Sequence, residues 1–426
     1  MADWMSNRIR AINSSSGMVS FVAGNGAAAY ANGAAASSSF NTPFGIAAAA
    51  DGSIFVGDGN THTIRKIVAN TVTTFAGTGS SGFANGAAPL FNHPQGLCID
   101  ALGNIIVADE VNFRLRLLFP NGSAITIAGS GINAEVDGPF PIGAFSNPVA
   151  VAPLGDGYAV VDYQGNTVRR VFPNKTTVTL AGNGSQAYAD GFRGASRLSR
   201  PWGIAVDVVG NMFITDAGNN RIRILSPSGY LSTLAGNGVA SSVNGFGTAA
   251  GFSNPCGVTL DAAGRIYVSE WGSHLVRKLT CVPCPASFYC LSGAPVTCPA
   301  GSSCPLSSIN ATRCPIGTYS AAGASNCTLC PAGTFTSATG SASCQQCPGG
   351  HFCPAGTSSW ARLNCGRGNY CPDGSCSPTP CPYHVPPTGG WGALQVQGPA
   401  FLVETAHCLN HCFWNFTSGD GMLSKC

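Results

Sequence analysis

The sequence predicts an all-β protein in two parts: a six-bladed β-propeller whose first and last blades are incomplete, followed by a disulfide-stapled cysteine-rich rod. Similar segments end on an Ala-Gly pair at five places, and successive pairs are 53, 52, 53 and 54 residues apart. The glycines of these pairs are Gly24, Gly77, Gly129, Gly182 and Gly236. Eighteen of the 20 cysteines lie between Cys281 and Cys426. A chain of 426 residues is also too long for one ordinary core, so at least two domains are expected.

Each repeat contains four short runs with the pattern of β-strands. In the unit at residues 202–236 these runs read WGIAVD, NMFITD, RIRIL and LSTLAG, and turns rich in Gly, Asn and Pro separate them. The first run is apolar throughout, as an inner strand requires, and the third alternates arginine with isoleucine, as a half-exposed outer strand does. Four strands in about 50 residues are typical of a propeller blade.

Counting recurrent positions gives six blades. The third strand begins near Arg8, Ile64, Arg114, Val168, Arg221 and Leu275. The second strand ends on an acid at Asp3, Asp58, Asp109, Asp162, Asp216 and Glu270. The first blade therefore begins at its second strand, and its inner strand is absent. The sixth blade has no fourth strand, because the cysteine-rich region directly follows its third strand. We expect the missing strands to come from residues upstream of Met1 or from a neighbouring subunit; five blades, with both ends sharing one blade, is the alternative.

Three motifs of the repeat resemble a known family. They are P-x-G-I-A-V-D on the first strand, V-x-D at the end of the second and N-R-I-R-x-I on the third, and over residues 1–280 they resemble NHL-repeat β-propellers. The resemblance implies that some relatives are lyases whose histidines hold zinc near the central axis. Here only His62, His93 and His274 lie in the propeller, and their positions do not recur in a way that would make them converge. Without G-x-S-x-G, H-E-x-x-H or P-loop motifs, we predict no enzymatic activity, no cofactor and no metal site.

Basic residues concentrate on the third strands, which hold 12 of the 21 lysines and arginines. They form either a basic girdle that binds acidic glycans or structural ion pairs with the acids of their own blades. The recurrent acid and a net charge of only +3 favour ion pairs. The pairs expected are Asp58 with Arg65, Asp109 with Arg116, and Asp216 with Arg223. The weak net charge also predicts no nucleic-acid partner, and no apolar run reaches the roughly 20 residues that span a bilayer.

Two sets of side chains are expected to be buried in the propeller. One position of the connectors between blades carries a large apolar residue, which we expect to pack between blades. These residues are Phe40, Phe91, Phe145, Leu198 and Phe252. Cys98 and Cys256 lie on the inner strands of blades that are not neighbours, so we expect two buried free thiols.

From Cys281 onward the sequence is dense in cysteine and poor in large apolar residues. The phrase C-P-x-G-T-[YF]-[ST], followed by G-x-x-x-C-x-x-C, resembles ephrin-receptor-like repeats, related in style to the modules of tumour necrosis factor receptors, over residues 281–382. Local spacing suggests a set of short-range disulfides, although spacing alone leaves the connectivity open. The suggested pairs are Cys284–Cys290, Cys298–Cys304, Cys314–Cys327, Cys330–Cys344, Cys347–Cys353 and Cys365–Cys371. Each such crosslink stabilises the fold by about 2–4 kcal/mol, which takes the place of the burial of apolar side chains.

The last part of the chain has a different composition. Residues 383–392 read as a linker, and residues 393–426 read as the start of a further disulfide-containing domain. His407 and His411, beside Cys408 and Cys412, are an alternative metal site. We favour disulfides, with Cys426 as a third partner.

The cysteine density indicates an oxidising, extracellular environment, and the N-glycosylation motifs agree with it. The candidate sites are Asn13, Asn121, Asn174, Asn183, Asn310, Asn326 and Asn415. The first three lie in turns between third and fourth strands, so their glycans are expected on one face of the disc. Asn183 lies in a connector on the opposite face.

Three functions fit these observations. The favoured one is a non-enzymatic structural glycoprotein that assembles with itself or with other extracellular matrix proteins in a fibre, flagellar hair or cell-wall layer. Charged residues make up only 9% of the chain, and the Gly, Ala and Ser-rich composition is similar to that of algal and protist surface proteins. The alternative is a receptor or adhesion ectodomain that binds a protein or glycan on a propeller face. An NHL-type lyase or hydrolase is the third, and it requires converging metal ligands.

Overall fold

The computed structural model describes residues 1–280, 283–291 and 294–381. It divides the chain into Met1–Cys281 and Val282–Cys426, one residue beyond the boundary expected at residue 280. The expected linker and further domain, with His407, His411 and Asn415, lie outside the described residues.

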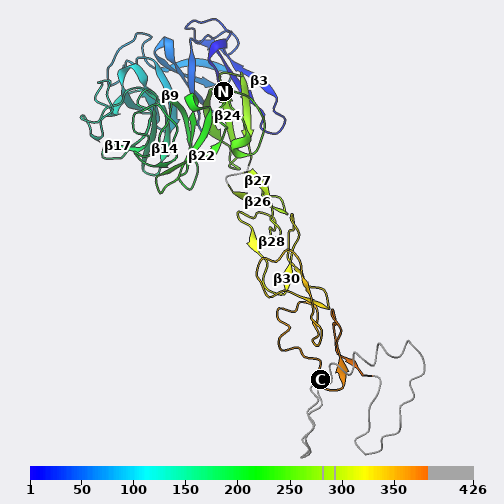
Figure 1. Ribbon diagram of the computed structural model, residues 1–426. Helices are drawn as coiled ribbons and strands as arrows, with labels where there is room; N and C mark the ends of the chain where they lie inside the picture. The colour runs from blue at the N-terminus through cyan, green and yellow to red at the C-terminus, as the bar shows by residue number, and fades with distance from the viewer. Residues whose placement is uncertain (281–282, 292–293, 382–426) are drawn as a thin grey trace, which may run out of the picture. The chain divides into compact units, whose positions relative to one another are not determined.

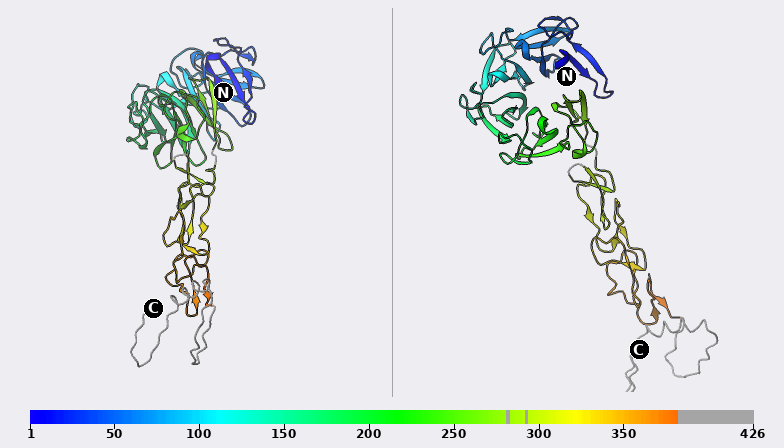
Figure 2. Two further views of the ribbon diagram at one scale, coloured as in Figure 1. Left: turned by 45° about the vertical axis from the view of Figure 1, so that its right-hand side comes forward. Right: turned by 45° about the horizontal axis from the view of Figure 1, so that its top comes forward.

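The first unit is a ring of six antiparallel sheets, which confirms the six-bladed propeller with incomplete first and last blades (Figures 1 and 2). Blade 1 contains β1 (Ala2–Asp3), β2 (Arg8–Ile12) and β3 (Val19–Ala23). Blade 2 contains β4 (Gly33–Ala34), β5 (Pro43–Ala48), β6 (Ile54–Asp58), β7 (Thr63–Val68) and β8 (Thr71–Ala76). Blade 3 contains β9 (Pro94–Ile99), β10 (Ile105–Asp109), β11 (Arg114–Leu118) and β12 (Ala124–Ala128).

The second half of the ring follows the same plan. Blade 4 contains β13 (Gly138–Pro139), β14 (Pro148–Leu154), β15 (Gly157–Asp162), β16 (Thr167–Val171) and β17 (Thr176–Ala181). Blade 5 contains β18 (Gly191–Phe192), β19 (Pro201–Val206), β20 (Met212–Asp216), β21 (Arg221–Leu225) and β22 (Tyr230–Ala235). Blade 6 contains β23 (Pro255–Leu260), β24 (Ile266–Glu270) and β25 (Leu275–Leu279). Short 3-10 turns are η1 (Trp4–Ser6), η2 (Gly59–Thr61), η3 (Glu110–Asn112), η4 (Ala217–Asn219) and η5 (Gly247–Ala249).

Antiparallel pairing gives the disc two distinct faces. Face A carries the turns between second and third strands and the connectors between blades, and face B carries the other two turns of each blade. Asn13, Asn121 and Asn174 are exposed on face B, whereas Asn183 is exposed in a connector on face A. Asn310 and Asn326 are exposed in the second unit.

The face A turn ends on a residue with left-handed backbone in all six blades. These residues are Asn7, His62, Phe113, Asn166, Asn220 and His274. Asparagine and histidine tolerate this conformation better than most residues do. In four blades the side chain also accepts a hydrogen bond from the backbone N–H that precedes the next inner strand. The bonds are Thr42 to Asn7, His93 to His62, Arg200 to Asn166 and Asn254 to Asn220, at 2.9–3.2 Å. The turn residue therefore joins each of these blades to the next.

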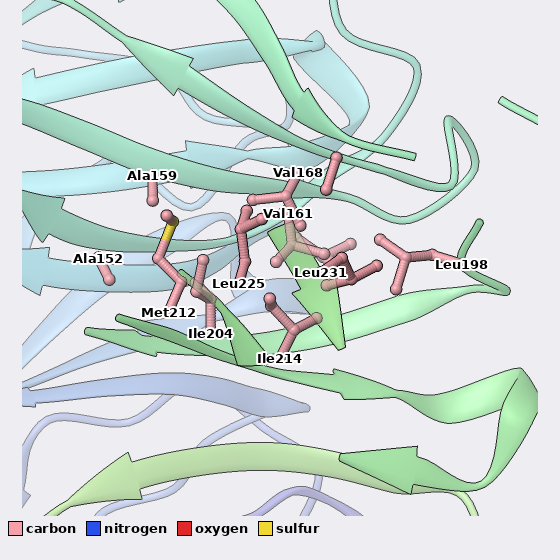
Figure 3. Packing of buried hydrophobic residues seen from close by; sticks show 12 residues of the cluster. Ala152, Ala159, Val161, Val168, Leu198, Ile204, Met212, Ile214, Leu225 and Leu231 are labelled. Carbon is pink, nitrogen blue, oxygen red and sulfur yellow. The ribbon is translucent and has the colours of Figure 1, made fainter. Parts of the chain in front are cut away.

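Five buried apolar clusters lie between successive blades, from the blade 1–blade 2 cluster to the blade 5–blade 6 cluster. The cluster between blades 4 and 5 is shown in Figure 3, where Val161, Val168, Ile214 and Leu225 point toward one another. The predicted connector residues pack into these clusters: Phe40, Phe91, Phe145, Leu198 and Phe252 are all at most 2% exposed. Among the described residues, no such cluster joins blade 6 to blade 1.

The second unit is a succession of two-stranded hairpins. Its strands are β26 (Phe288–Leu291), β27 (Ala294–Thr297), β28 (Ser302–Ser303), β29 (Thr312–Arg313), β30 (Thr318–Tyr319), β31 (Thr328–Leu329), β32 (Thr334–Phe335), β33 (Gln345–Gln346), β34 (Asn369–Tyr370) and β35 (Thr379–Pro380). A glycine N–H of one hairpin module donates to a cysteine carbonyl of the preceding module at four successive steps. The bonds are Gly323 to Cys298, Gly340 to Cys314, Gly356 to Cys330 and Gly374 to Cys347, each 2.8 Å long. The modules therefore stack in chain order as the predicted rod.

The C-P-x-G phrase is explained by this stacking. A Cβ added to Gly317 would lie 2.4 Å from the carbonyl oxygen of Gly356, and one added to Gly333 would lie 2.2 Å from that of Gly374. Only glycine permits so close an approach of backbone to backbone.

Candidate functional site: the channel mouth and the ring opening

The six residues predicted to form blade ion pairs lie in three equivalent buried pairs. Arg65 donates to Asp58 at 3.0 Å, Arg116 to Asp109 at 2.8 Å and Arg223 to Asp216 at 2.7 Å, and all six side chains are 0% exposed. Each guanidinium also donates to carbonyl oxygens of the connector before its blade. Arginines that are fully buried cannot form an exposed girdle for acidic glycans.

Blade 4 departs from this pattern. Arg169 is buried, but its ion pairs are with Glu135 at 3.3 Å and Asp137 at 2.6 Å, two acids of the preceding connector. Asp162, the acid of the same blade, accepts hydrogen bonds from backbone N–H groups instead. The expectation that each arginine pairs with the acid of its own blade is therefore wrong for blade 4.

Each buried arginine also lies over aromatic rings. The Cζ atom of Arg65 is 5.2 Å from the Phe40 ring centroid, and that of Arg116 is 5.2 Å from the Phe91 ring centroid. The connector phenylalanines therefore fill the space between blades and also contact the buried cations.

Burial has the largest effect on the pKa values of the buried carboxyl groups. It raises the pKa of Asp58 to about 6, although the hydrogen bond from Asn41 and the charge of Arg65 lower it. Burial likewise raises the pKa of Asp109 and of Asp216. Burial, together with repulsion from Asp162, raises the pKa of Glu135 to about 7.

These shifts predict a propeller that is most stable at mildly acidic pH. Because the pKa of Asp58 in the folded chain is above its unfolded value of 3.8, its contribution to the free energy of unfolding is greatest below that value and decreases as pH rises to about 6. We expect the melting temperature at pH 5 to be higher than at pH 7.5 by a few degrees, about 2–4 °C per kcal/mol. Scanning calorimetry measures this difference, and Asp58→Asn should reduce it. A melting temperature that decreases steadily from pH 7.5 to pH 5 would contradict the expectation.

A channel of about 1030 Å³ runs along the axis of the ring, lined by the inner strands. At its face A mouth each blade supplies one ring side chain to a continuous network. The contacts between ring centroids are Trp271–Trp4 at 5.9 Å, Trp4–Phe44 at 5.4 Å, Phe44–His93 at 5.4 Å, Phe44–Trp202 at 6.5 Å and Trp202–Tyr163 at 5.0 Å. Except for Trp271, which is 47% exposed, the rings are partly buried. We call these six side chains the aromatic mouth.

A carboxylate with three donors lies beside the aromatic mouth. Glu110 accepts hydrogen bonds from His93, Gln95 and, at 2.9 Å, Asn147. Burial alone would raise the pKa of Glu110, but the hydrogen bonds from these side chains lower it below its usual value. Gln95 is 3% exposed and lines the channel, and its Oε1 atom has no hydrogen-bond partner.

Two of the propeller histidines are neighbours across a blade boundary, through a backbone hydrogen bond and without forming a shared set of metal ligands. The backbone N–H of His93 donates to Nδ1 of His62 at 3.2 Å, because the turn of blade 2 meets the inner strand of blade 3 on face A. Burial, with a smaller effect of His93, lowers the pKa of His62. Among the described residues, no group of three or more His, Cys, Asp or Glu side chains is placed to hold a metal ion.

The two propeller thiols differ in burial. Cys98 is buried, and burial raises the pKa of its thiol far above the usual range. Cys256 is only partly buried, which corrects the expectation of two buried thiols, because it lines the central channel at the position that the partly buried Phe44 and Trp202 occupy in blades 2 and 5. The Sγ atom of Cys256 lies 3.3 Å from the hydroxyl of Ser269.

The ring opens between blades 6 and 1, as Figure 2 (right) shows. At the second position of the third strand, Ile222 of blade 5 is 0% exposed, whereas Val276 of blade 6 is 37% exposed. Leu275 beside it is 47% exposed. We call β25 together with β1 the ring seam, because β25 lacks a fourth strand and β1 lacks an inner strand.

In the described residues of the second unit, six disulfides join twelve cysteines. They link Cys284 to Cys290, Cys298 to Cys304, Cys314 to Cys327, Cys330 to Cys344, Cys347 to Cys353, and Cys365 to Cys371. These are the pairs that local spacing suggests. Most of these disulfides include at least one cysteine that is 0% exposed. Phe335 is one of the few large apolar side chains that are buried beside the described disulfides.

Two family models match the chain. The model described as NHL repeat matches residues 91–116, and the model described as tyrosine-protein kinase ephrin type A/B receptor-like matches residues 317–365. The chain carries an NHL-repeat propeller and an ephrin-receptor-like cysteine-rich region. The disulfides and the ephrin-receptor-like region fit an extracellular protein with a surface or protein-interaction role. No helix in the described part of the chain has the length and apolar character needed to cross a membrane.

Curated relatives match about three fifths of the chain. NHL repeat-containing protein 2 of Bos taurus is 26% identical over 318 residues, which cover 62% of this chain and 44% of that protein. Protein SUPPRESSOR OF QUENCHING 1, chloroplastic, of Arabidopsis thaliana is 24% identical over 282 residues, which cover 61% of this chain and 27% of that protein. The chain thus spans less than half the length of either relative.

Solved propellers also resemble the chain. An auxiliary nutrient binding protein from Bacteroides thetaiotaomicron has a TM-score of 0.49 and 14% identity, with 65% of this chain and 64% of that chain covered. A streptogramin B lyase has a TM-score of 0.42 and 15% identity, with 65% and 87% covered.

Proposed function

We propose that the chain is a non-enzymatic extracellular structural glycoprotein that assembles with other copies of itself at the ring seam, as a subunit of a fibre, flagellar hair or cell-wall layer. The observation that carries the proposal is the uncovered side of blade 6. An edge strand with unpaired backbone N–H and C=O groups is a template for another strand, and the exposed side chains of Leu275 and Val276 add apolar surface to it.

Two further features support assembly. Charged residues make up 9% of the chain, so little electrostatic repulsion keeps copies apart. None of the exposed propeller sequons, Asn13, Asn121, Asn174 and Asn183, lies on β1 or β25, so their glycans are not attached to the strands of the ring seam. A contact between different surfaces of two copies extends into a filament when its symmetry does not close.

The proposal is tested by the association of the purified, glycosylated full chain. Sedimentation velocity over a wide concentration range should show oligomers, and electron microscopy should show axial or lateral contacts. Leu275→Lys places a charge on the edge strand and should weaken association about tenfold or more. The control is Val208→Lys in a face B turn of blade 5, where the wild-type side chain is fully exposed and the change should have no effect. Wild-type protein that stays monomeric at every concentration would overturn the proposal.

A second candidate function is a receptor or adhesion ectodomain that binds its ligand on a propeller face. The aromatic mouth favours it, because half-buried aromatic rings with a few polar groups at the end of a channel are typical of ligand sites.

A further inference from the structure

We propose that the aromatic mouth is a binding site for a neutral oligosaccharide, an inference that rests on the second candidate function. The site consists of the six rings and of three polar side chains that line the same channel: Gln95, Arg200 and Asn254.

The rings supply flat apolar surface at the centre of face A. Trp271 and Trp4 are in edge contact, Trp4 stacks on Phe44 with an interplanar angle of 22°, and Trp202 lies 6.5 Å beyond Phe44. The C–H faces of sugar rings pack on such surfaces, where the aromatic face carries partial negative charge. Because the rings come from all six blades, the surface extends across the axis of the ring and suits an extended chain of sugars.

Each polar side chain of the site has hydrogen-bonding capacity that no side chain of the described structure satisfies. Gln95 is 3% exposed and its Oε1 atom has no hydrogen bond, so it is a buried acceptor that lacks a donor. A buried polar group without a partner is costly, and a ligand donor would remove that cost. In the described structure, the guanidinium of Arg200 and the amide of Asn254 also have no side-chain partner within the protein, and both are exposed beside the channel.

Hydroxyl groups match this set, because each one both donates and accepts. A proline-rich peptide also packs on aromatic surfaces, but proline has no backbone N–H to donate to Gln95. A quaternary ammonium group has no donor either, and Glu110 already has three donors of its own. Arg200 and Glu110 carry opposite charges, so the mouth provides no reason to prefer an acidic or basic polymer.

The binding is measured by tryptophan fluorescence of the full chain, because three of its six tryptophans lie at the mouth. The probes are neutral hexasaccharides of β-1,4-glucan and β-1,4-mannan, and the N-glycans released from the purified chain itself. Saturable changes with either class support the proposal, and the class that binds more tightly identifies the source as a polysaccharide or a neighbouring copy. A decaproline peptide and oligogalacturonate are the comparison ligands.

Two variants distinguish binding at the aromatic mouth from nonspecific binding to exposed aromatic side chains. Trp271→Ala removes a side chain that is 47% exposed, so the fold should persist, and it should weaken binding about tenfold or more. Phe21→Ala removes an aromatic side chain that is 51% exposed on the outer strand β3, and binding should not change. The same titration on Leu275→Lys, whose self-association should be weaker, separates sugar binding from assembly.

The proposal is overturned if no neutral oligosaccharide gives a saturable change at millimolar concentration. It is also overturned if decaproline or oligogalacturonate binds more tightly than the neutral sugars, or if Phe21→Ala weakens binding as much as Trp271→Ala does. A wild-type chain that binds the sugars but stays monomeric would reject the assembly function alone.

Discussion

Arg223→Met is expected to lower the free energy of unfolding of the propeller by about 3–5 kcal/mol, because it leaves Asp216 buried without its cation. Both side chains are 0% exposed, and Arg223 also donates to Asp190 and to two connector carbonyls. The loss corresponds to a decrease in melting temperature of about 10 °C. Thermal and urea unfolding of the full chain measure it.

The matched control is Arg170→Met, which breaks an ion pair of the same chemical type at the surface. Arg170 is 28% exposed and its partner Asp156 is 70% exposed, so the change should cost less than about 1 kcal/mol. The double variant Arg223→Met with Asp216→Leu should recover part of the loss, because it removes both buried charges. Equal losses for Arg223→Met and Arg170→Met would show that burial does not set the cost.

The regularity of the repeat made these pairs predictable. In Asp58–Arg65, Asp109–Arg116 and Asp216–Arg223 the acid and the arginine are seven residues apart, on neighbouring strands of one hairpin. Asp162 and Arg169 have the same spacing, yet Arg169 pairs with Glu135 and Asp137, more than 30 residues earlier. Spacing within a hairpin gives no information on which connector acids fold back onto it.

The aromatic mouth was not predicted, although a signal for it is present in the sequence. Trp4, Tyr163 and Trp271 each follow the acid that ends a second strand, while Phe44 and Trp202 each follow the proline that begins a first strand. These two positions lie together only on face A of the assembled ring. Because five blades use one or the other of them and blade 3 supplies His93 from the residue before its proline, no single repeat position collects the rings.

The number of blades and the disulfides depend mostly on local sequence, which is why the fold was predictable to this extent. The exposure of an inner-strand side chain depends also on the central channel, which only the assembled ring creates. Cys256 shows the difference: its strand pattern predicts burial, but it lines the channel and is only partly buried.

Removing one disulfide of the rod, with Cys314→Ser and Cys327→Ser, is expected to destabilise the second unit by about 2–4 kcal/mol. Cys314 is 0% exposed, and its carbonyl accepts the inter-module hydrogen bond from Gly340. Loss of the crosslink should expose this bond to hydrogen exchange and open residues 301–345 to proteolysis. Mass spectrometry of both reactions locates the change.

None of the six disulfides among the described residues lies in the propeller, so the unfolding of the propeller should not change in this variant. The control Cys376→Ser changes an exposed cysteine outside the six disulfides and should leave exchange near Gly340 as it was. If the double variant keeps full protection at Gly340, apolar packing would have to hold the modules together. The module interiors are mainly cysteine sulfur, with Phe335 and Trp360 in one small cluster, so that outcome would require a source of stability that the described side chains do not provide.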